Sequence, residues 1–166
     1  SRRTRHNQVV TSPRRIVAVI NPQAAFGKHA HLGAAVEARL SAEGFDFVVI
    51  RGRDFLDARD QLERTLTSND ALLVVGGDGM VSMAVNLVAE TGIPFAVMPG
   101  GTGNDFARGL GYPVDNLHAC LDKAVASLRA VPTAIDLARV RGDHEPEGTR
   151  GVFYACVLSA GFDAFV

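Results

Sequence analysis

Two glycine-rich stretches carry the residues best suited to chemistry. The first, Gly76-Gly77-Asp78-Gly79, directly follows an apolar run, and the second, Gly100-Gly101-Thr102-Gly103-Asn104-Asp105, follows another. Glycine lets a backbone turn tightly and approach a ligand with no Cβ in the way. The free N–H groups at the start of a following helix attract an anion such as phosphate. Two such turns on successive strands therefore predict a site for a phosphate-bearing ligand.

Three polar side chains of these turns are candidates for contact with such a ligand. Asp78 places a carboxylate where an anion is expected, which makes sense if Mg²⁺ joins carboxylate and phosphate oxygens. Its alternative role is to cap the following helix. Thr102 offers a hydroxyl to a phosphate oxygen, and Asn104 can hydrogen-bond the turn itself. Asp78 is thus the candidate metal ligand.

The common nucleotide-binding motifs do not fit the sequence. A Walker loop around Gly27-Lys28 would need Gly at 22 and Ser or Thr at 29, where the chain has Pro22 and His29. A dinucleotide fingerprint through the first turn would need Gly or Ala at position 82, where Ser82 stands. Neither a P-loop enzyme nor a typical NAD dehydrogenase is supported.

The composition is that of one globular domain. The chain has 166 residues, of which 47% are hydrophobic and 21% are charged, and its formal net charge of -1 argues against nucleic acid as a partner. No apolar run reaches the roughly 18 residues of a membrane span. Two cysteines cannot form a disulfide framework, so we expect a cytoplasmic protein. Residues 1–14 read as a basic, flexible N-terminal arm, which a membrane surface can attract.

Around these turns the sequence predicts alternating strands and helices. The apolar runs with β-branched residues predict strands, and the runs with apolar residues at helical spacing predict helices. Expected strands span 15–20, 45–50, 71–75 and 94–98, and expected helices span 29–42, 54–66, 81–89 and 116–129. Two further strands at 134–140 and 152–159 are expected to form a hairpin. This alternation predicts a parallel sheet covered on both faces, with ligands beyond the carboxyl ends of its strands.

Several of these motifs together resemble a known family. Asn21-Pro22, the Gly76–Gly79 turn and the stretch Pro99–Arg108 resemble the catalytic-domain signature of diacylglycerol kinases, a group that includes bacterial lipid kinases and sphingosine kinases. Ile135-Asp136-Leu137 and Gly161-Phe162-Asp163 are also similar to it. The Gly-Gly-Asp-Gly turn alone resembles NAD kinases and phosphofructokinases as well. The longer stretch Pro99–Arg108 is what selects a lipid kinase.

The resemblance implies an α/β fold with a parallel-sheet, three-layer nucleotide-binding domain of the phosphofructokinase/NAD kinase type at 15–140. It also implies a C-terminal β-rich domain, of which 141–166 would be the start and the rest is apparently absent. That domain is expected to supply the catalytic base, so no catalytic residue is assigned here. ATP and Mg²⁺ are the implied cofactors. The implied binding residues are Asn21, Pro22, Gly76, Gly77, Asp78, Gly79, Met80, Gly101, Thr102 and Asn104.

The function implied is an ATP-dependent lipid kinase. It transfers the γ-phosphate of ATP to a lipid hydroxyl, with diacylglycerol as the favoured acceptor, and is cytoplasmic and peripheral at the membrane. A homodimer is left open. One alternative is an NAD kinase-like phosphotransferase. The other is a non-catalytic nucleotide-binding regulatory module, because Met80 and Ala24-Ala25 replace residues that the family usually has. We expect residues 1–166 alone to bind nucleotide weakly and to phosphorylate little lipid.

Overall fold

Four parallel strands form the centre of this computed structural model, which describes residues 14–21, 31–142, 146 and 148–155. They are β1 (Ile16–Ile20), β2 (Phe47–Arg51), β3 (Ala71–Gly76) and β4 (Phe95–Pro99), and they lie side by side in the order β2-β1-β3-β4. All residues of the two central strands, β1 and β3, are buried, because helices cover both faces of the sheet.

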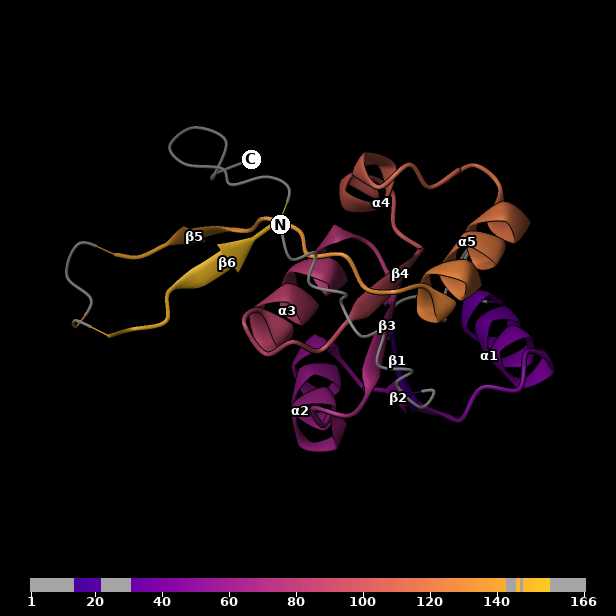
Figure 1. The fold of residues 1–166 in the computed structure, drawn as a ribbon, viewed down its shortest axis with the longest axis horizontal. Coiled ribbons are helices and arrows are strands. Elements are labelled where there is room, and N and C mark those ends of the chain that lie inside the picture. Colours follow the sequence, from indigo (N-terminus) through magenta and orange to yellow (C-terminus); the bar gives the residue numbers. More distant parts are fainter. Residues whose placement is uncertain (1–13, 22–30, 143–145, 147, 156–166) are drawn as a thin grey trace, which may run out of the picture.

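Helices form the two outer layers. α1 (Leu32–Ala42) and α5 (Leu117–Arg129) lie on one face of the sheet, and α2 (Phe55–Thr65) and α3 (Asp78–Val88) lie on the other (Figure 1). The expected three-layer α/β fold with a parallel sheet is therefore confirmed. Its strand order has a consequence for ligands. The chain goes from β1 outward to β2, then returns past β1 to β3 and continues to β4, so the direction of winding reverses between β1 and β3.

Two helices differ from the expectation in ways that bear on the glycine turns. α3 begins at Asp78 instead of residue 81, because Gly77 is still extended and the helix starts with the very next residue. A five-residue helix, α4 (Asp105–Gly109), follows the second turn and was not expected. It is too short for a helical pattern of apolar residues to be recognised.

The last described segment is a two-stranded antiparallel hairpin of β5 (Ala138–Val140) and β6 (Val152–Tyr154). The hairpin itself was expected, but both strands are shorter than the apolar runs in the sequence. It extends away from the sheet beside α3 (Figure 1). The remainder of the expected last strand and Gly161-Phe162-Asp163 lie outside the described residues.

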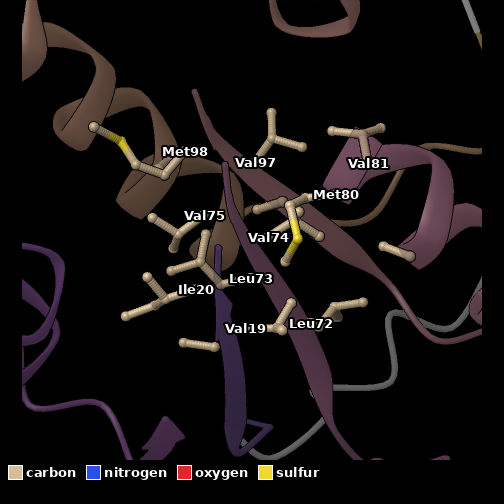
Figure 2. Close-up of a cluster of buried hydrophobic side chains, with 14 of the residues drawn as sticks. Val19, Ile20, Leu72, Leu73, Val74, Val75, Met80, Val81, Val97 and Met98 are labelled. Atoms are coloured by element: carbon tan, nitrogen blue, oxygen red, sulfur yellow. The ribbon is translucent and has the colours of Figure 1, made fainter. Parts of the chain in front are cut away.

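The core packs directly beneath the first glycine turn. Figure 2 shows side chains of β1, β3, β4 and α3 gathered there, with Met80 beside Val74 and near Val97. Met80 is only 3% exposed, and Leu72, Val74 and Val75 are fully buried. The turn after β3 is thus held from below by close-packed apolar side chains, which fix where its backbone points.

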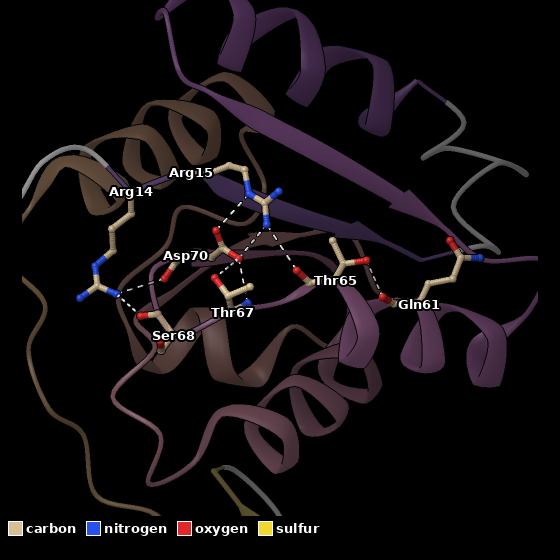
Figure 3. A network of polar contacts seen from close by, with 7 residues as sticks. All are labelled: Arg14, Arg15, Gln61, Thr65, Thr67, Ser68 and Asp70. Atoms are coloured by element: carbon tan, nitrogen blue, oxygen red, sulfur yellow. Dashed lines mark hydrogen bonds and ion pairs between the residues drawn. The ribbon is translucent and has the colours of Figure 1, made fainter.

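The opposite edge of the sheet is fastened by a polar network (Figure 3). The Arg15 guanidinium binds both carboxylate oxygens of Asp70, with Nε–Oδ1 at 3.0 Å and Nη2–Oδ2 at 2.9 Å. Asp70 Oδ2 also accepts hydrogen bonds from the backbone N–H and the hydroxyl of Thr67. These contacts join the start of β1 to the start of β3. The carboxyl ends of the strands, where the glycine turns lie, take no part in them.

Candidate functional site

The two glycine turns touch each other through their backbones. Gly100 N donates to Gly76 O at 3.0 Å. A Cβ built on Gly101 would lie 2.5 Å from Gly77 Cα, and one on Gly77 would lie 3.0 Å from Gly101 Cα. No residue with a side chain fits between them at that distance. The sequence predicted glycine for close approach to a ligand, whereas at these two positions the close approach is between the turns.

The end of β1 lies next to the first turn. Asn21 N donates to Val75 O at 2.9 Å, and a Cβ on Gly76 would lie 3.2 Å from the Asn21 Cβ. Asn21, Gly76 and Gly100 therefore stand at the carboxyl ends of three neighbouring strands. This is also the point where the winding of the sheet reverses, which in open α/β sheets is where ligands bind. Pro22 lies outside the described residues.

The described residues leave the first turn of α3 uncovered. Among them, the backbone N–H groups of Asp78 and Gly79 have no acceptor. A Cβ built on Gly79 would likewise meet none of their heavy atoms within 4 Å. The helix has eleven residues, so its dipole adds a partial positive charge at this end. Uncovered amides, a positive helix end and a bare backbone are features that favour an anion.

Asp78 connects the two turns. Its Oδ2 accepts a hydrogen bond from Asp105 N at 3.0 Å, and its Oδ1 accepts one from Phe106 N at 3.1 Å. These amides are the first two of α4, whose own N-cap residue makes no side-chain cap. The alternative interpretation, that Asp78 caps the helix directly after its own turn, is therefore wrong, since that helix begins at Asp78 itself. The carboxylate instead caps α4, the next helix along the chain.

Asn104 closes the second turn on itself. Its side chain is buried, with Oδ1 accepting from Gly101 N at 2.9 Å and Nδ2 donating to Gly101 O at 2.7 Å. Its backbone is left-handed (φ 56°), a conformation that asparagine tolerates better than most residues. The predicted turn-forming role is present in the structure.

The remaining side chains of the turns divide into buried and exposed ones. Met80 is buried in the core, and its N–H donates to Gly77 O at 3.0 Å, so it shapes the turn from below. Thr102 is exposed, with its hydroxyl unpaired among the described residues. Arg108 is also exposed, and its Nε donates to Gly103 O at 3.0 Å. That bond holds a guanidinium at the rim of the second turn.

Two buried titratable groups lie in the packing of α5, away from the turns. Burial raises the pKa of the Cys120 thiol, which donates to Pro113 O at 3.3 Å. Burial also raises the pKa of Tyr112, whose hydroxyl lies 3.4 Å from Ser127 Oγ. In both groups burial favours the neutral form.

The acidic residues of the site suit Mg²⁺ only together with a ligand's oxygens. Among the described residues, no three His, Cys, Asp or Glu side chains form a cluster that could hold a metal ion. Mg²⁺ often takes only one or two carboxylates, with phosphate oxygens and water as its other ligands. Asp78 can supply such a carboxylate, since each of its oxygens has a lone pair beyond the one used by α4.

Known proteins share both this sequence and this fold. Residues 15–140 match the family model of the diacylglycerol kinase catalytic domain. The chain belongs to this family. It is 37% identical over 153 residues to a diacylglycerol kinase of Mycobacterium tuberculosis, which covers 92% of this chain and 47% of that protein. The crystal structure of a diacylglycerol kinase from Bacillus anthracis superposes with a TM-score of 0.57 and 28% identity, covering 68% of this chain and 40% of that one.

The family match confirms the resemblance seen in the sequence. Relatives that the chain matches are named as diacylglycerol kinase and lipid kinase. Another relative, "Probable lipid kinase YegS-like" of Pseudomonas fluorescens, is 35% identical over 113 residues, which are 66% of this chain and 36% of that protein. The chain thus spans about half the length, or less, of these curated relatives. No helix in the described residues is both long and apolar enough to cross a membrane.

Proposed function

We propose that this chain forms the nucleotide-binding part of an ATP-dependent lipid kinase. The enzyme transfers the γ-phosphate of ATP to a lipid hydroxyl, and diacylglycerol, which would become phosphatidic acid, is the acceptor. The observation that carries the proposal is the meeting of three strand ends at one corner, where the described residues leave the backbone and the amides at the start of α3 uncovered. The choice of diacylglycerol as the acceptor rests on the relatives that are named diacylglycerol kinases.

Within this proposal each part of the corner has a task. The amides of Asp78 and Gly79 bind phosphate oxygens, while Asn21 and Thr102 border the same space from β1 and from the second turn. Asp78 would hold Mg²⁺, and the metal, when bound, would neutralise phosphate charge. Phosphoryl transfer depends mainly on such positioning and charge neutralisation. The acceptor resides in a bilayer, so we further propose that the protein works in the cytoplasm at the membrane surface.

Titration of Mg-ATP into the chain tests the nucleotide site. We expect saturable binding, and we expect Gly79→Ala to weaken it at least tenfold because the new methyl group occupies the open space at the start of α3. Gly109→Ala is the matched control, since a Cβ there also meets nothing within 4 Å but lies at the far end of α4. An absence of binding, or equal binding by both variants, contradicts the proposed site.

The acceptor is tested separately, with the complete gene product. Radiolabelled ATP is offered with diacylglycerol in mixed micelles, and in a parallel reaction with NAD. We expect label in phosphatidic acid alone. Label in NADP instead would support the phosphotransferase alternative, and nucleotide binding without label in either product would support the regulatory module.

A further inference from the structure

The end of α3 remote from the glycine turn holds the β5–β6 hairpin through one side-chain amide. Asn86 Oδ1 accepts a hydrogen bond from Phe153 N at 2.9 Å, and Asn86 Nδ2 donates to Phe153 O at 2.8 Å. A neighbouring antiparallel strand would make the same two bonds with its backbone. Nδ2 also donates to Ser82 O at 2.9 Å, which orients the amide. We call these two bonds between Asn86 and Phe153 the Asn86 clasp.

Arg150 of the hairpin also binds the last turn of α3. Its guanidinium donates to Asn86 O at 3.2 Å and also to Ala89 O. These are among the last carbonyls of α3, and a cation at this end of a helix is favoured by its dipole. The Phe153 ring is 5% exposed, and the guanidinium carbons of Arg139 and Arg150 lie 5.6 and 5.4 Å from its centroid. The hairpin is therefore docked on α3 by specific polar bonds as well as by burial.

α3 thus carries a different attachment at each end. Its first turn offers the open amides and Asp78, and its last turn carries the Asn86 clasp. The whole helix has eleven residues and is about 16 Å long. The buried side chains of this helix pack on β3, so we expect it to shift as one rigid body and not to bend. A displacement of one end of α3 then displaces the other end as well.

We propose that Asn86 is a positioning residue that couples docking of the hairpin to nucleotide binding through α3. The coupling rests on the proposed function, because it takes nucleotide phosphates as the ligand of the first turn. A ligand that fixes the start of α3 also fixes the surface on which Phe153 docks. By linkage, nucleotide binding and hairpin docking then favour each other by the same factor.

Hydrogen exchange at the Phe153 amide tests the clasp without any nucleotide. Asn86→Ala removes the acceptor of this amide, so we expect its exchange to speed up at least tenfold while amides of α5 exchange as before. Asn69→Ala is the matched control, because Asn69 is exposed in a turn and has no side-chain partner among the described residues. Equal protection of Phe153 in Asn86→Ala and in the wild type overturns the clasp.

A second variant guards against an effect on α3 itself. Arg150→Gln removes a charge from the hairpin side and leaves every residue of α3 in place. We expect faster exchange at Phe153, by a smaller factor than in Asn86→Ala, and unchanged protection of the amides in the middle of α3. If Arg150→Gln leaves Phe153 as protected as in the wild type, the hairpin is not docked through this end of the helix.

Mg-ATP tests the coupling. We expect saturating Mg-ATP to slow exchange at Phe153 in the wild type, and Asn86→Ala to raise the Kd for Mg-ATP by the same factor, fivefold or more. A merely structural role of Asn86 would lower stability without moving this Kd. Binding that leaves Phe153 exchange unchanged overturns the coupling alone. Failure of the wild type to bind Mg-ATP overturns both the coupling and the proposed function, while the exchange data without nucleotide still decide the clasp.

Discussion

Glycine at position 101 serves the contact between two backbones more than it serves a ligand. An added Cβ would stand 2.5 Å from Gly77 Cα, an atom that cannot move aside without moving the whole turn. Gly79 is the contrasting case, because its Cβ would enter open space. The two turns thus use glycine for different reasons. Gly101 allows the turns to pack against each other, and Gly79 keeps the start of α3 accessible to the proposed ligand.

This difference predicts opposite results for two alanine variants. Gly101→Ala should lower the free energy of unfolding by about 1–3 kcal/mol, the usual cost of overpacking a close contact. Gly79→Ala should unfold no more easily than the wild type, since alanine is the better helix former. Urea unfolding followed by circular dichroism measures both. Equal stability of the two variants would show that the turns do not touch as described.

Met80 departs from the family pattern at a buried position beneath the first turn. In the sequence Met80 is a replacement for the residue that the family usually has, and it is one reason to consider a non-catalytic module. In the structure its side chain is 3% exposed and lies beneath the turn, where a Cβ on Gly76 would come within 2.7 Å of its Cγ. Its contribution to the site is the shape of the Gly76–Gly79 backbone.

At the level of elements, α4 depends on a residue outside it. A five-residue helix is far below the length at which helices are stable alone. The Asp78 carboxylate accepts the first two amides of α4, and Lys123 Nζ donates to Leu110 O and Gly111 O just past its other end. The helix is therefore supported at both ends by side chains from neighbouring elements.

Removal of the Asp78 carboxylate should loosen α4 selectively. In Asp78→Ala both capped amides lose their acceptor, so we expect the amides of Asp105 and Phe106 to exchange about tenfold faster or more, which corresponds to about 1.4 kcal/mol. Amides of α5 serve as the internal reference in the same hydrogen-exchange experiment. Asp105→Asn is the matched variant, because Asp105 contributes its backbone N–H to the cap and not its carboxylate. Equal exchange in both variants would contradict the capping role.

On the scale of the whole molecule, the amino ends and the carboxyl ends of the strands differ in their polar contacts. The edge with the amino ends of the strands is closed by Arg15 and Asp70, which bind each other bidentately. At the edge with the carboxyl ends, the amides of Asp78 and Gly79 find no acceptor among the described residues. One edge of the sheet is thus closed by an ion pair, and the other carries the groups that the proposed function assigns to a ligand.

The closed edge predicts a pH dependence of stability. The hydrogen bonds from Arg15 lower the pKa of Asp70 below its usual value, and those from Thr67 act in the same direction. A lowered folded-state pKa stabilises the protein fully above the unfolded value of about 3.9 and loses that effect as the pH falls through the folded value. The wild type should therefore lose stability below about pH 4.

Asp70→Asn isolates this contribution. We expect it to cost about 2 kcal/mol at pH 7, because Arg15 loses its charged partner but remains partly exposed to water. The difference from the wild type should shrink as the pH falls toward 2, where the carboxyl group is protonated in both states. Denaturant unfolding across this pH range measures it, with Asp60→Asn, an exposed position on α2, as the control. A difference that stays constant with pH would rule out the ion pair as its source.

The sequence by itself determined the layers of this protein and the end of the sheet at which its glycine turns stand. Continuous apolar runs at 71–75 and 94–98, alternating with helical patterns, predict buried parallel strands, and glycines that directly follow such runs are then expected at the carboxyl edge of the sheet. Those are local signals, because each depends on residues next to one another in the chain.

Only the tertiary structure decided which groups meet across that edge. Asp78 and the amide of Phe106 are separated by 27 intervening residues, and Asn86 and Phe153 by 66, so no pattern in the sequence relates them. Such bonds arise when the sheet brings two turns together, or when a helix end reaches a hairpin. A carboxylate or an amide can form hydrogen bonds with many different groups, and the packing of the fold decides which of them lies within reach.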